Sequence, residues 1–177
     1  LIRLKKFIPV AAGMAGGSSD AAAVLFGVNK MFRLGLTTEQ LMERGVKIGA
    51  DVPYCILRGT ALSEGIGEVL TKLPPVPQCQ VLVAKPGINV STKFVYENLH
   101  ANDLSPDVHP DIDGMIQAIR DQDFMGIAGR LGNVLETVTI KEYPVIQEIK
   151  DKVPSLASPV LFTDLPDCLE VHILKRG

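Results

Sequence analysis

The chain has 177 residues, of which 46% are hydrophobic and 21% are charged, and its net charge at pH 7 is −2. This composition predicts a packed core and excludes a disordered chain. Without a run of lysine or arginine, no nucleic-acid or membrane partner is expected. No apolar run approaches the ~20 residues of a membrane span, and a secretory signal pattern is absent. The 3 cysteines (Cys55, Cys79 and Cys168) lack metal-ligand spacing and favour a cytoplasmic location.

The first segment predicts a strand followed by a loop and a helix. Residues 1–8 alternate loosely and are interpreted as a strand. Because the sequence starts inside this strand without a methionine, we expect a fragment whose partner strands lie upstream. Residues 9–17 have mostly small side chains and predict a loop. Residues 20–32 have apolar side chains at helical spacing, with a serine N-cap at 18–19 and an end at Gly35.

The next elements are a helix, a strand and a hairpin. The helix is predicted from Thr37, which has capping-box spacing to Gln40, as far as Gly49. A short apolar strand is predicted at 54–57. Residues 59–68 predict a β hairpin with a glycine-rich turn.

The second half predicts one strand, then helices, then a tail of different character. The β-branched residues of 80–86 indicate a strand. The segments with helical spacing are 91–98, 111–120, 124–135 and 143–150. The tail 153–177 contains three prolines within thirteen residues, and strands are predicted at 159–162 and 171–174. The element order predicts an α+β fold in two layers, with a break at the prolines between 74 and 77.

Small side chains are concentrated between Ala11 and Ala21, where nine of the eleven residues are Gly, Ala or Ser. Glycine allows positive φ and lets backbone N–H groups approach a ligand. The helix that follows directs its unpaired N–H groups and positive dipole end toward the same space, which predicts a phosphate site. The spacing matches neither the P-loop nor the dinucleotide fingerprint. The alternative explanation is a tight strand–helix connection with small residues for close packing.

A single carboxylate, Asp51, lies in the turn Ile48-Gly49-Ala50-Asp51-Val52-Pro53. A rigid turn aspartate is suited to act as a general base toward a hydroxyl, to orient that hydroxyl, or to hold Mg²⁺. An ordinary turn aspartate is the alternative, and it is the commoner case for a hexapeptide of this kind.

Other polar residues are expected to have structural or solvated roles. His100 and His109 lie in a polar loop and are interpreted as solvated rather than as metal ligands. Tyr54 is expected to pack in the core, and Cys55 to be a buried small hydrophobic residue. One helical turn separates two further residues to which a structural role is assigned, Asn133 and Glu136.

Several segments resemble a known family. Residues 9–22, Pro-Val-Ala-Ala-Gly-Met-Ala-Gly-Gly-Ser-Ser-Asp-Ala-Ala, resemble the second signature motif of the GHMP kinases. Residues 48–53 are similar to the catalytic-aspartate segment of the members that phosphorylate 4-diphosphocytidyl-2-C-methyl-D-erythritol. Residues 84–92 and 132–136 also resemble those members, so that the likeness covers about residues 5–152.

The resemblance implies an ATP- and Mg²⁺-dependent kinase of bacterial isoprenoid biosynthesis that acts on a small molecule, cytidine diphosphate-linked methylerythritol. Asp51 would be the catalytic residue. Residues 1–73 would be part of the N-terminal, ATP-binding domain, and 79–177 the C-terminal helical, ferredoxin-like domain with an atypical tail at 153–177. The residues implied to wrap the ATP phosphates are Pro9, Val10, Ala11, Ala12, Gly13, Met14, Ala15, Gly16, Gly17, Ser18 and Ser19.

The chain departs from the family pattern at two places. The family's assisting lysine belongs to a strand upstream of Leu1, and neither Lys5 nor Lys6 is nominated in its place. The third glycine-rich motif is expected after Lys152, but residues 155–162 contain no glycine. The alternatives are therefore another GHMP kinase, for mevalonate, homoserine or a sugar, or an inactive nucleotide-binding remnant. The oligomeric state is left open.

Overall fold

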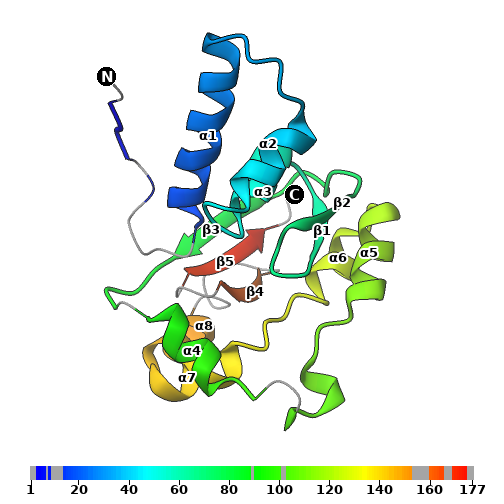
Figure 1. The fold of residues 1–177 in the computed structure, drawn as a ribbon. Coiled ribbons are helices and arrows are strands. Elements are labelled where there is room, and N and C mark those ends of the chain that lie inside the picture. The colour runs from blue at the N-terminus through cyan, green and yellow to red at the C-terminus, as the bar shows by residue number, and fades with distance from the viewer. Residues whose placement is uncertain are drawn as a thin grey trace. The chain divides into compact units, whose positions relative to one another are not determined.

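The computed structural model describes residues 3–6, 8, 14–88, 90–100, 103–152, 160–165 and 169–174. The chain divides into two compact units, of which the first comprises Leu1–Val10 and Ala15–Pro75 and the second Ala11–Met14 and Val76–Gly177. Helices and short strands occur together, and the α+β class is confirmed (Figure 1). The assignment of 1–73 and 79–177 to two kinase domains stays a prediction.

Three helices and a hairpin make up the described part of the first unit. Helix α1 (Gly16–Met31) packs against α2 (Thr38–Gly45) and α3 (Val52–Leu57). A hairpin is present as predicted, with β1 (Ala61–Glu64) paired antiparallel with β2 (Val69–Lys72), but its second strand lies beyond the predicted range of 59–68. The residues buried among these elements are Ala22, Leu41, Gly45, Val52 and Pro53.

The start of α1 differs from the expectation. The helix begins at Gly16, and its N-cap is Ala15 in the left-handed region (φ 47°, ψ 31°), without a side-chain cap. The predicted serine N-cap at 18–19 is therefore wrong, because both serines already lie in the first helical turn. The Ser19 hydroxyl donates back to the Gly16 carbonyl at 2.9 Å instead of accepting from a backbone amide.

The C-terminal end of α1 and the segment before the helix also differ from the prediction. Helix α1 ends at Met31, and Gly35 (φ 69°) lies beyond it in the connection to α2. Residues 3–6 and 8 have no regular secondary structure, so the predicted strand at 1–8 is wrong for its described part. A strand requires a neighbour for its backbone hydrogen bonds, and no strand pairs with these residues within the described part of the chain.

The capping box of α2 is confirmed in both directions. The Thr37 side chain accepts from the Gln40 N–H at 3.3 Å, and the Gln40 side chain accepts from the Thr37 N–H at 3.0 Å. The helix ends at Gly45, earlier than the expected Gly49. A Cβ at Gly45 would lie 2.8 Å from Val52 Cγ1, so glycine at this place lets α2 and α3 approach closely.

The strand predicted at 54–57 is wrong, since these residues belong to helix α3. A short apolar run does not distinguish a strand from a buried helix. Pro53 lies in the first turn of α3, where a missing N–H leaves no hydrogen bond unmade. Asp51 therefore lies in a turn between two helices and not in a helix-to-strand turn.

The second unit combines helices with a three-stranded antiparallel sheet. The strand order is β3-β5-β4, so that β5 pairs with both neighbours. Val81 of β3 lies opposite Ile173 of β5, and Phe162 of β4 lies opposite His172 of β5. The strand predicted at 80–86 is confirmed, and the tail strands are confirmed over longer spans; Pro159 lies outside the described residues. The elements are β3 (Gln80–Ala84), α4 (Thr92–Asn98), η2 (Pro106–Val108), α5 (Ile112–Arg120), α6 (Phe124–Ala128), α7 (Glu136–Glu142), α8 (Val145–Lys152), β4 (Val160–Leu165) and β5 (Leu169–Leu174).

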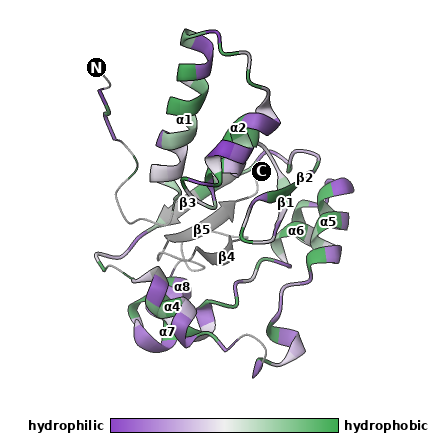
Figure 2. Cartoon of the chain, in the orientation of Figure 1, coloured by the Kyte–Doolittle hydropathy of each residue, from purple (hydrophilic) through white to green (hydrophobic). Residues whose placement is uncertain are grey.

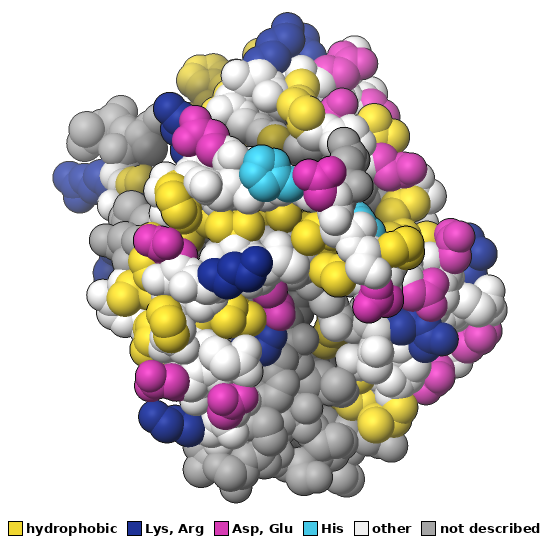
Figure 3. Space-filling model, turned by 90° about the horizontal axis from the view of Figure 1, so that it is seen from below, with side chains coloured by type: hydrophobic (Ala, Val, Ile, Leu, Met, Phe, Trp, Pro, Cys, Tyr) yellow, Lys and Arg dark blue, Asp and Glu magenta, His cyan; other side chains and the backbone are white. Residues whose placement is uncertain are grey.

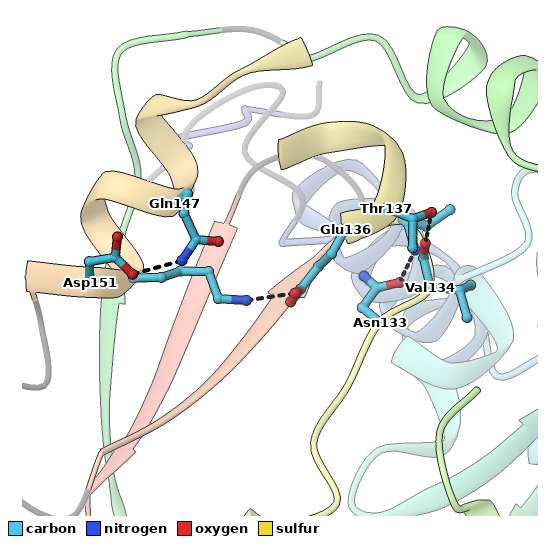
Figure 4. Close-up of polar contacts among 8 residues, drawn as sticks. Asn133, Val134, Glu136, Thr137, Gln147 and Asp151 are labelled. Atoms are coloured by element: carbon cyan, nitrogen blue, oxygen red, sulfur yellow. Dashed lines mark hydrogen bonds and ion pairs between the residues drawn. The ribbon is translucent and has the colours of Figure 1, made fainter. Parts of the chain in front are cut away.

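The prediction was least accurate between α6 and α8. The helix expected at 124–135 ends at Ala128, and α7 was not predicted. Asn133 precedes α7 and accepts from the Leu135 N–H at 3.0 Å, so it does not share a helix with Glu136 as expected. Glu136 forms a 2.6 Å ion pair with Lys150 of α8, and the two side chains are only 21% and 15% exposed (Figure 4). The buried residues of this unit are Val95, Ala118, Ile119, Ile127, Ala128, Leu135, Thr139 and Ile146.

Candidate functional site

The described part of the expected phosphate loop is Met14–Ser19, while Pro9, Val10, Ala11, Ala12 and Gly13 lie outside the described residues. Gly17 is exposed and Ser18 is half-buried at the start of α1. In Figure 2 the first turn of α1 is pale, which marks residues of intermediate hydropathy, and the turns above it include green, hydrophobic residues. A Cβ at Gly17 would meet no atom within 4 Å, so the space beside this residue is open.

The backbone amides at the start of α1 have no hydrogen-bond acceptor among the residues that the structure describes. The N–H groups of Gly16, Gly17 and Ser18 occupy the first three helical positions, where an α-helix provides no acceptor. Neither a side-chain cap nor an acidic residue is present in the first turn. The positive end of the helix dipole is therefore not neutralised by the protein's own carboxylates there.

The structure places Asp51 at the N-cap position of α3, exposed to solvent. The turn before it is fixed by a hydrogen bond from the Val52 N–H to the Gly49 carbonyl (3.2 Å). The Asp51 carbonyl accepts from the Cys55 N–H (3.1 Å), while its carboxylate does not cap α3. The backbone of Asp51 is thus held in place, and its carboxylate has no hydrogen-bond or ion-pair partner among the residues that the structure describes.

The turn that contains Asp51 lies against the first turn of α1. A Cβ at Gly49 would stand 4.0 Å from the Ser18 hydroxyl oxygen and 3.7 Å from Val52 Cγ2. Helices α1 and α3 also pack on each other directly. The structure therefore brings together the described end of the predicted phosphate loop and the turn of the predicted catalytic aspartate, which are distant in sequence.

A lysine that sequence reasoning set aside lies near the same helix. Lys6 forms a 2.6 Å ion pair with Asp20, and the two side chains are 33% and 31% exposed. The pair connects the segment before the loop to the second turn of α1. The sequence did not predict this ion pair, because local sequence patterns do not relate two residues that are fourteen positions apart.

Two neighbours of Asp51 on α3 differ from their expected roles. Tyr54 is 42% exposed and donates to the Gly59 carbonyl at 2.7 Å, so its predicted core packing is wrong. Cys55 is half-buried rather than buried. Burial raises the pKa of the Cys55 thiol, and the nearby negative charge of Asp51 raises it further.

The two loop histidines show no sign of a metal centre. His100 and His109 are exposed, and Figure 3 shows a histidine side chain lying open at the surface. No group of three His, Cys, Asp or Glu side chains arranged for a metal occurs among the residues that the structure describes. Within the same residues, no helix has the length and apolar character needed to cross a membrane.

Comparison with known proteins gives relatives for most of the chain. Residues 1–59 match the family described as the GHMP kinases N terminal domain. The 4-diphosphocytidyl-2-C-methyl-D-erythritol kinase of Lachnospira eligens is 55% identical over 175 residues, covering 94% of this chain and 60% of the relative. The enzyme of the same name from Lachnoclostridium phytofermentans is 62% identical over 149 residues, covering 84% of this chain and 50% of the relative.

A solved structure gives the same result for the fold. The crystal structure of a 4-(cytidine 5'-diphospho)-2C-methyl-D-erythritol kinase superposes with a TM-score of 0.74 at 27% identity, covering 96% of this chain and 59% of that one. The chain thus spans between half and three fifths of the length of these relatives. Sequence motif, family match, relatives and fold agree, and residues 1–59 belong to the N-terminal domain family of the GHMP kinases.

Proposed function

We propose that this chain provides the phosphate-binding and catalytic elements of a kinase. The reaction is transfer of the ATP γ-phosphoryl group to the 2-hydroxyl of 4-diphosphocytidyl-2-C-methyl-D-erythritol, a step in non-mevalonate isoprenoid biosynthesis. The names of relatives at 55% and 62% identity support this substrate. The observation that carries the proposal is the packing of α1 on α3, which places the Asp51 turn beside the first turn of α1: a Cβ added at Gly49 would lie 4.0 Å from the Ser18 hydroxyl oxygen.

In this proposal the segment Pro9–Ser19 binds the phosphates of ATP. The uncapped start of α1 supports the assignment, because the N–H groups of Gly16, Gly17 and Ser18 have no intrahelical acceptor. Three amide donors together with the helix dipole suit a polyphosphate. Glycine at position 17 leaves room for phosphate oxygens to reach the backbone.

Asp51 is proposed to act on the acceptor hydroxyl. Its open carboxylate would accept the hydroxyl proton while the substrate oxygen forms a bond to the γ-phosphorus and the bond to the β–γ bridging oxygen breaks, which releases ADP. A base is needed because the neutral hydroxyl must lose its proton in the course of transfer. The fixed backbone of the Gly49–Val52 turn supports this role, since phosphoryl transfer depends mainly on positioning.

Magnesium is proposed to accompany the nucleotide. Mg²⁺ prefers oxygen ligands and is commonly held by one or two carboxylates together with substrate phosphates. The oxygen donors present, the open Asp51 carboxylate and the Ser18 hydroxyl, fit that type of site better than an all-protein cage. When bound, the ion would supply charge neutralisation at the phosphate oxygens.

Two alternatives differ from this proposal in substrate or in chemistry. Another GHMP kinase, for mevalonate, homoserine or a sugar, would share the phosphate loop and differ in its acceptor pocket. A chain that binds nucleotide without turnover would share the phosphate loop and lack the chemistry. A cytoplasmic location is also proposed, with support from the free thiols Cys55 and Cys79.

The test is the Asp51→Asn variant, with Asp113→Asn in the exposed first turn of α5 as the matched control. Turnover of ATP with 4-diphosphocytidyl-2-C-methyl-D-erythritol is expected to fall about 10²- to 10⁴-fold in Asp51→Asn. Calorimetry should still detect ATP–Mg²⁺ binding, weakened by no more than the loss of one Mg²⁺ ligand, and the control should match the wild type in both assays. ATP binding without wild-type turnover would favour the nucleotide-binding alternative, and absence of ATP binding would refute the kinase proposal.

A further inference from the structure

The turn of the β1–β2 hairpin contacts the peptide immediately before Asp51. A Cβ added at Gly67 would lie 3.3 Å from the Ala50 carbonyl oxygen, 3.7 Å from its carbonyl carbon and 3.8 Å from the Ala50 Cβ. All three neighbouring atoms belong to one residue, and two of them are backbone. Gly67 therefore packs directly on the Ala50 peptide group, and no larger residue fits without moving it.

Gly67 is itself held firmly in the turn. Its backbone has φ 119°, a conformation that favours glycine. Its N–H donates to the Glu64 carbonyl at 3.1 Å, and its carbonyl accepts from the Ser63 hydroxyl at 3.1 Å. The Glu68 carboxylate accepts from the Ile66 N–H at 2.7 Å, which fixes the rest of the turn. The surface that Gly67 presents to Ala50 is thus rigid.

Successive residues before Asp51 therefore contact two different segments. Gly49 borders Ser18 of α1, and Ala50 borders Gly67 of the hairpin. We propose that Gly67 is a positioning residue for Asp51: the hairpin turn fixes the Ala50–Asp51 peptide and thereby the place of the carboxylate relative to the start of α1. The effect on turnover rests on the proposed kinase function, whereas the effect on the Asp51 backbone does not.

The geometry sets the size of the expected effect. A Cβ–oxygen separation of 3.3 Å is tighter than almost all real contacts, so the Ala50 peptide must move by a few tenths of an ångström in Gly67→Ala. A misplacement of about 1 Å can reduce a rate about 100-fold, so the smaller shift is expected to lower kcat about 10-fold. The affinity for ATP–Mg²⁺ should stay within about twofold, because the amides of α1 that bind it do not touch Gly67.

Gly65 provides the matched control in the same turn. It also has positive φ (72°), so Gly65→Ala and Gly67→Ala both place alanine in a strained conformation and both lower stability. The three atoms nearest a Cβ at Gly65 all belong to the Glu68 side chain, within the hairpin, at 2.7, 2.8 and 3.0 Å, whereas those nearest a Cβ at Gly67 belong to Ala50. A role of Gly67 limited to turn formation predicts the same behaviour for both variants.

The experiment records amide ¹⁵N–¹H spectra and turnover for the full chain and for both variants. In Gly67→Ala the amide signals of Ala50 and Asp51 are expected to shift and kcat to fall about 10-fold, while in Gly65→Ala these signals and kcat keep their wild-type values. If Gly67→Ala does not fold, Ser63→Ala, which removes the hydrogen bond to the Gly67 carbonyl, should shift the same two signals by a smaller amount.

Unchanged Ala50 and Asp51 signals in the folded variant, or equal changes in both alanine variants, would overturn the proposal. Shifted Ala50 and Asp51 signals in Gly67→Ala, together with a wild-type chain that has no turnover, would refute the proposed function alone. The positioning role of Gly67 and the proposed kinase function can therefore fail separately, because the amide spectra can be recorded on a chain without enzymatic activity.

Discussion

Helix α1 in the first unit begins without a side-chain cap, whereas helix α5 in the second unit has the N-cap Asp111, whose carboxylate accepts from the Gly114 N–H at 2.9 Å. The same Asp111 carboxylate also accepts from Arg130 Nε at 3.0 Å, and Arg130 donates further to the Gly126 carbonyl. Donors and acceptors at the α5 start are thus paired within the protein.

The start of α1 has the opposite arrangement. Its first-turn Ser19 hydroxyl donates back to the helix instead of capping it, and Gly16 and Gly17 cannot cap through a side chain. An unmet amide at a helix end lowers stability unless water or a ligand accepts from it. The difference is that the α5 start is stabilised by a side chain of the protein, whereas the α1 start has no side-chain cap. Four predictions test whether the nucleotide phosphates bind at the α1 start, as proposed.

The largest expected effect comes from a negative charge at the open helix start. Gly17→Asp places a carboxylate in the first turn of α1, where it stabilises the helix by about 0.3–1 kcal/mol. The same charge repels phosphate, and the affinity for ATP–Mg²⁺ should fall at least about 10-fold. Gly17→Asn is the neutral control. Calorimetry that gave the aspartate and asparagine variants equal affinity would contradict the assignment.

A smaller effect is expected from a methyl group alone. At Gly17 and at Gly27, both in α1, an added Cβ meets nothing within 4 Å, so each alanine variant should stabilise the helix by about 0.5–1 kcal/mol. Only Gly17→Ala should also weaken ATP–Mg²⁺ binding, by about 1 kcal/mol or less, since its methyl group enters the space proposed for phosphate. Thermal melts and calorimetry on the pair separate the two effects, and equal binding by both variants would count against the phosphate site.

The capped helix start should show a pH dependence that the open one lacks. The hydrogen bond from the Gly114 N–H, followed by that from Arg130, lowers the pKa of Asp111 below its ordinary value. The stability contributed by its ionised form is therefore complete above about pH 4 and is lost as the pH falls through the lowered folded-state pKa. The Tm difference between wild type and Asp111→Asn should shrink between about pH 4 and pH 2. A constant difference would show that the charge is not involved, and ATP binding at pH 7 should not change.

The smallest effect concerns the thiol next to the proposed catalytic turn. Because the charge of Asp51 contributes to the raised pKa of Cys55, Asp51→Asn should lower that pKa. More thiolate then forms at pH 8, and alkylation of the Cys55 peptide by iodoacetamide should accelerate by less than about 3-fold, since burial is the larger cause. Asp113→Asn is the control. An unchanged rate would place the Asp51 charge too far from Cys55 to be felt.

The sequence predicted those features that depend on local chemistry. The Thr37–Gln40 capping box, the hairpin and the strand at 80–86 follow from short-range patterns, and the structure confirms them. Residues 54–57 were assigned wrongly because an apolar run of that length fits both a strand and a buried helix. Helix α7, which follows the turn at Asn133, was missed because its short sequence has no clear helical periodicity of apolar residues.

The candidate site was predictable in its parts but not in its assembly. The density of small residues before α1 indicated the phosphate loop, and the Gly-Ala-Asp-Val-Pro turn indicated Asp51. The contacts that join them, from Gly49 to Ser18 and from Gly67 to Ala50, depend on packing between segments that are distant in the chain. Glycine at positions 49 and 67 is consistent with the close approach of another segment, but a single sequence does not show which segment that is.

Titration of ATP–Mg²⁺ into the ¹⁵N-labelled full chain tests the account most directly. The largest saturable amide shifts are expected at Gly16, Gly17 and Ser18, with smaller ones at Ala50 and Asp51, while the capped start of α5 around Gly114 stays unchanged. Saturable binding that leaves those α1 amides unmoved, or no binding at all, would contradict the claim that the open start of α1 holds the nucleotide phosphates.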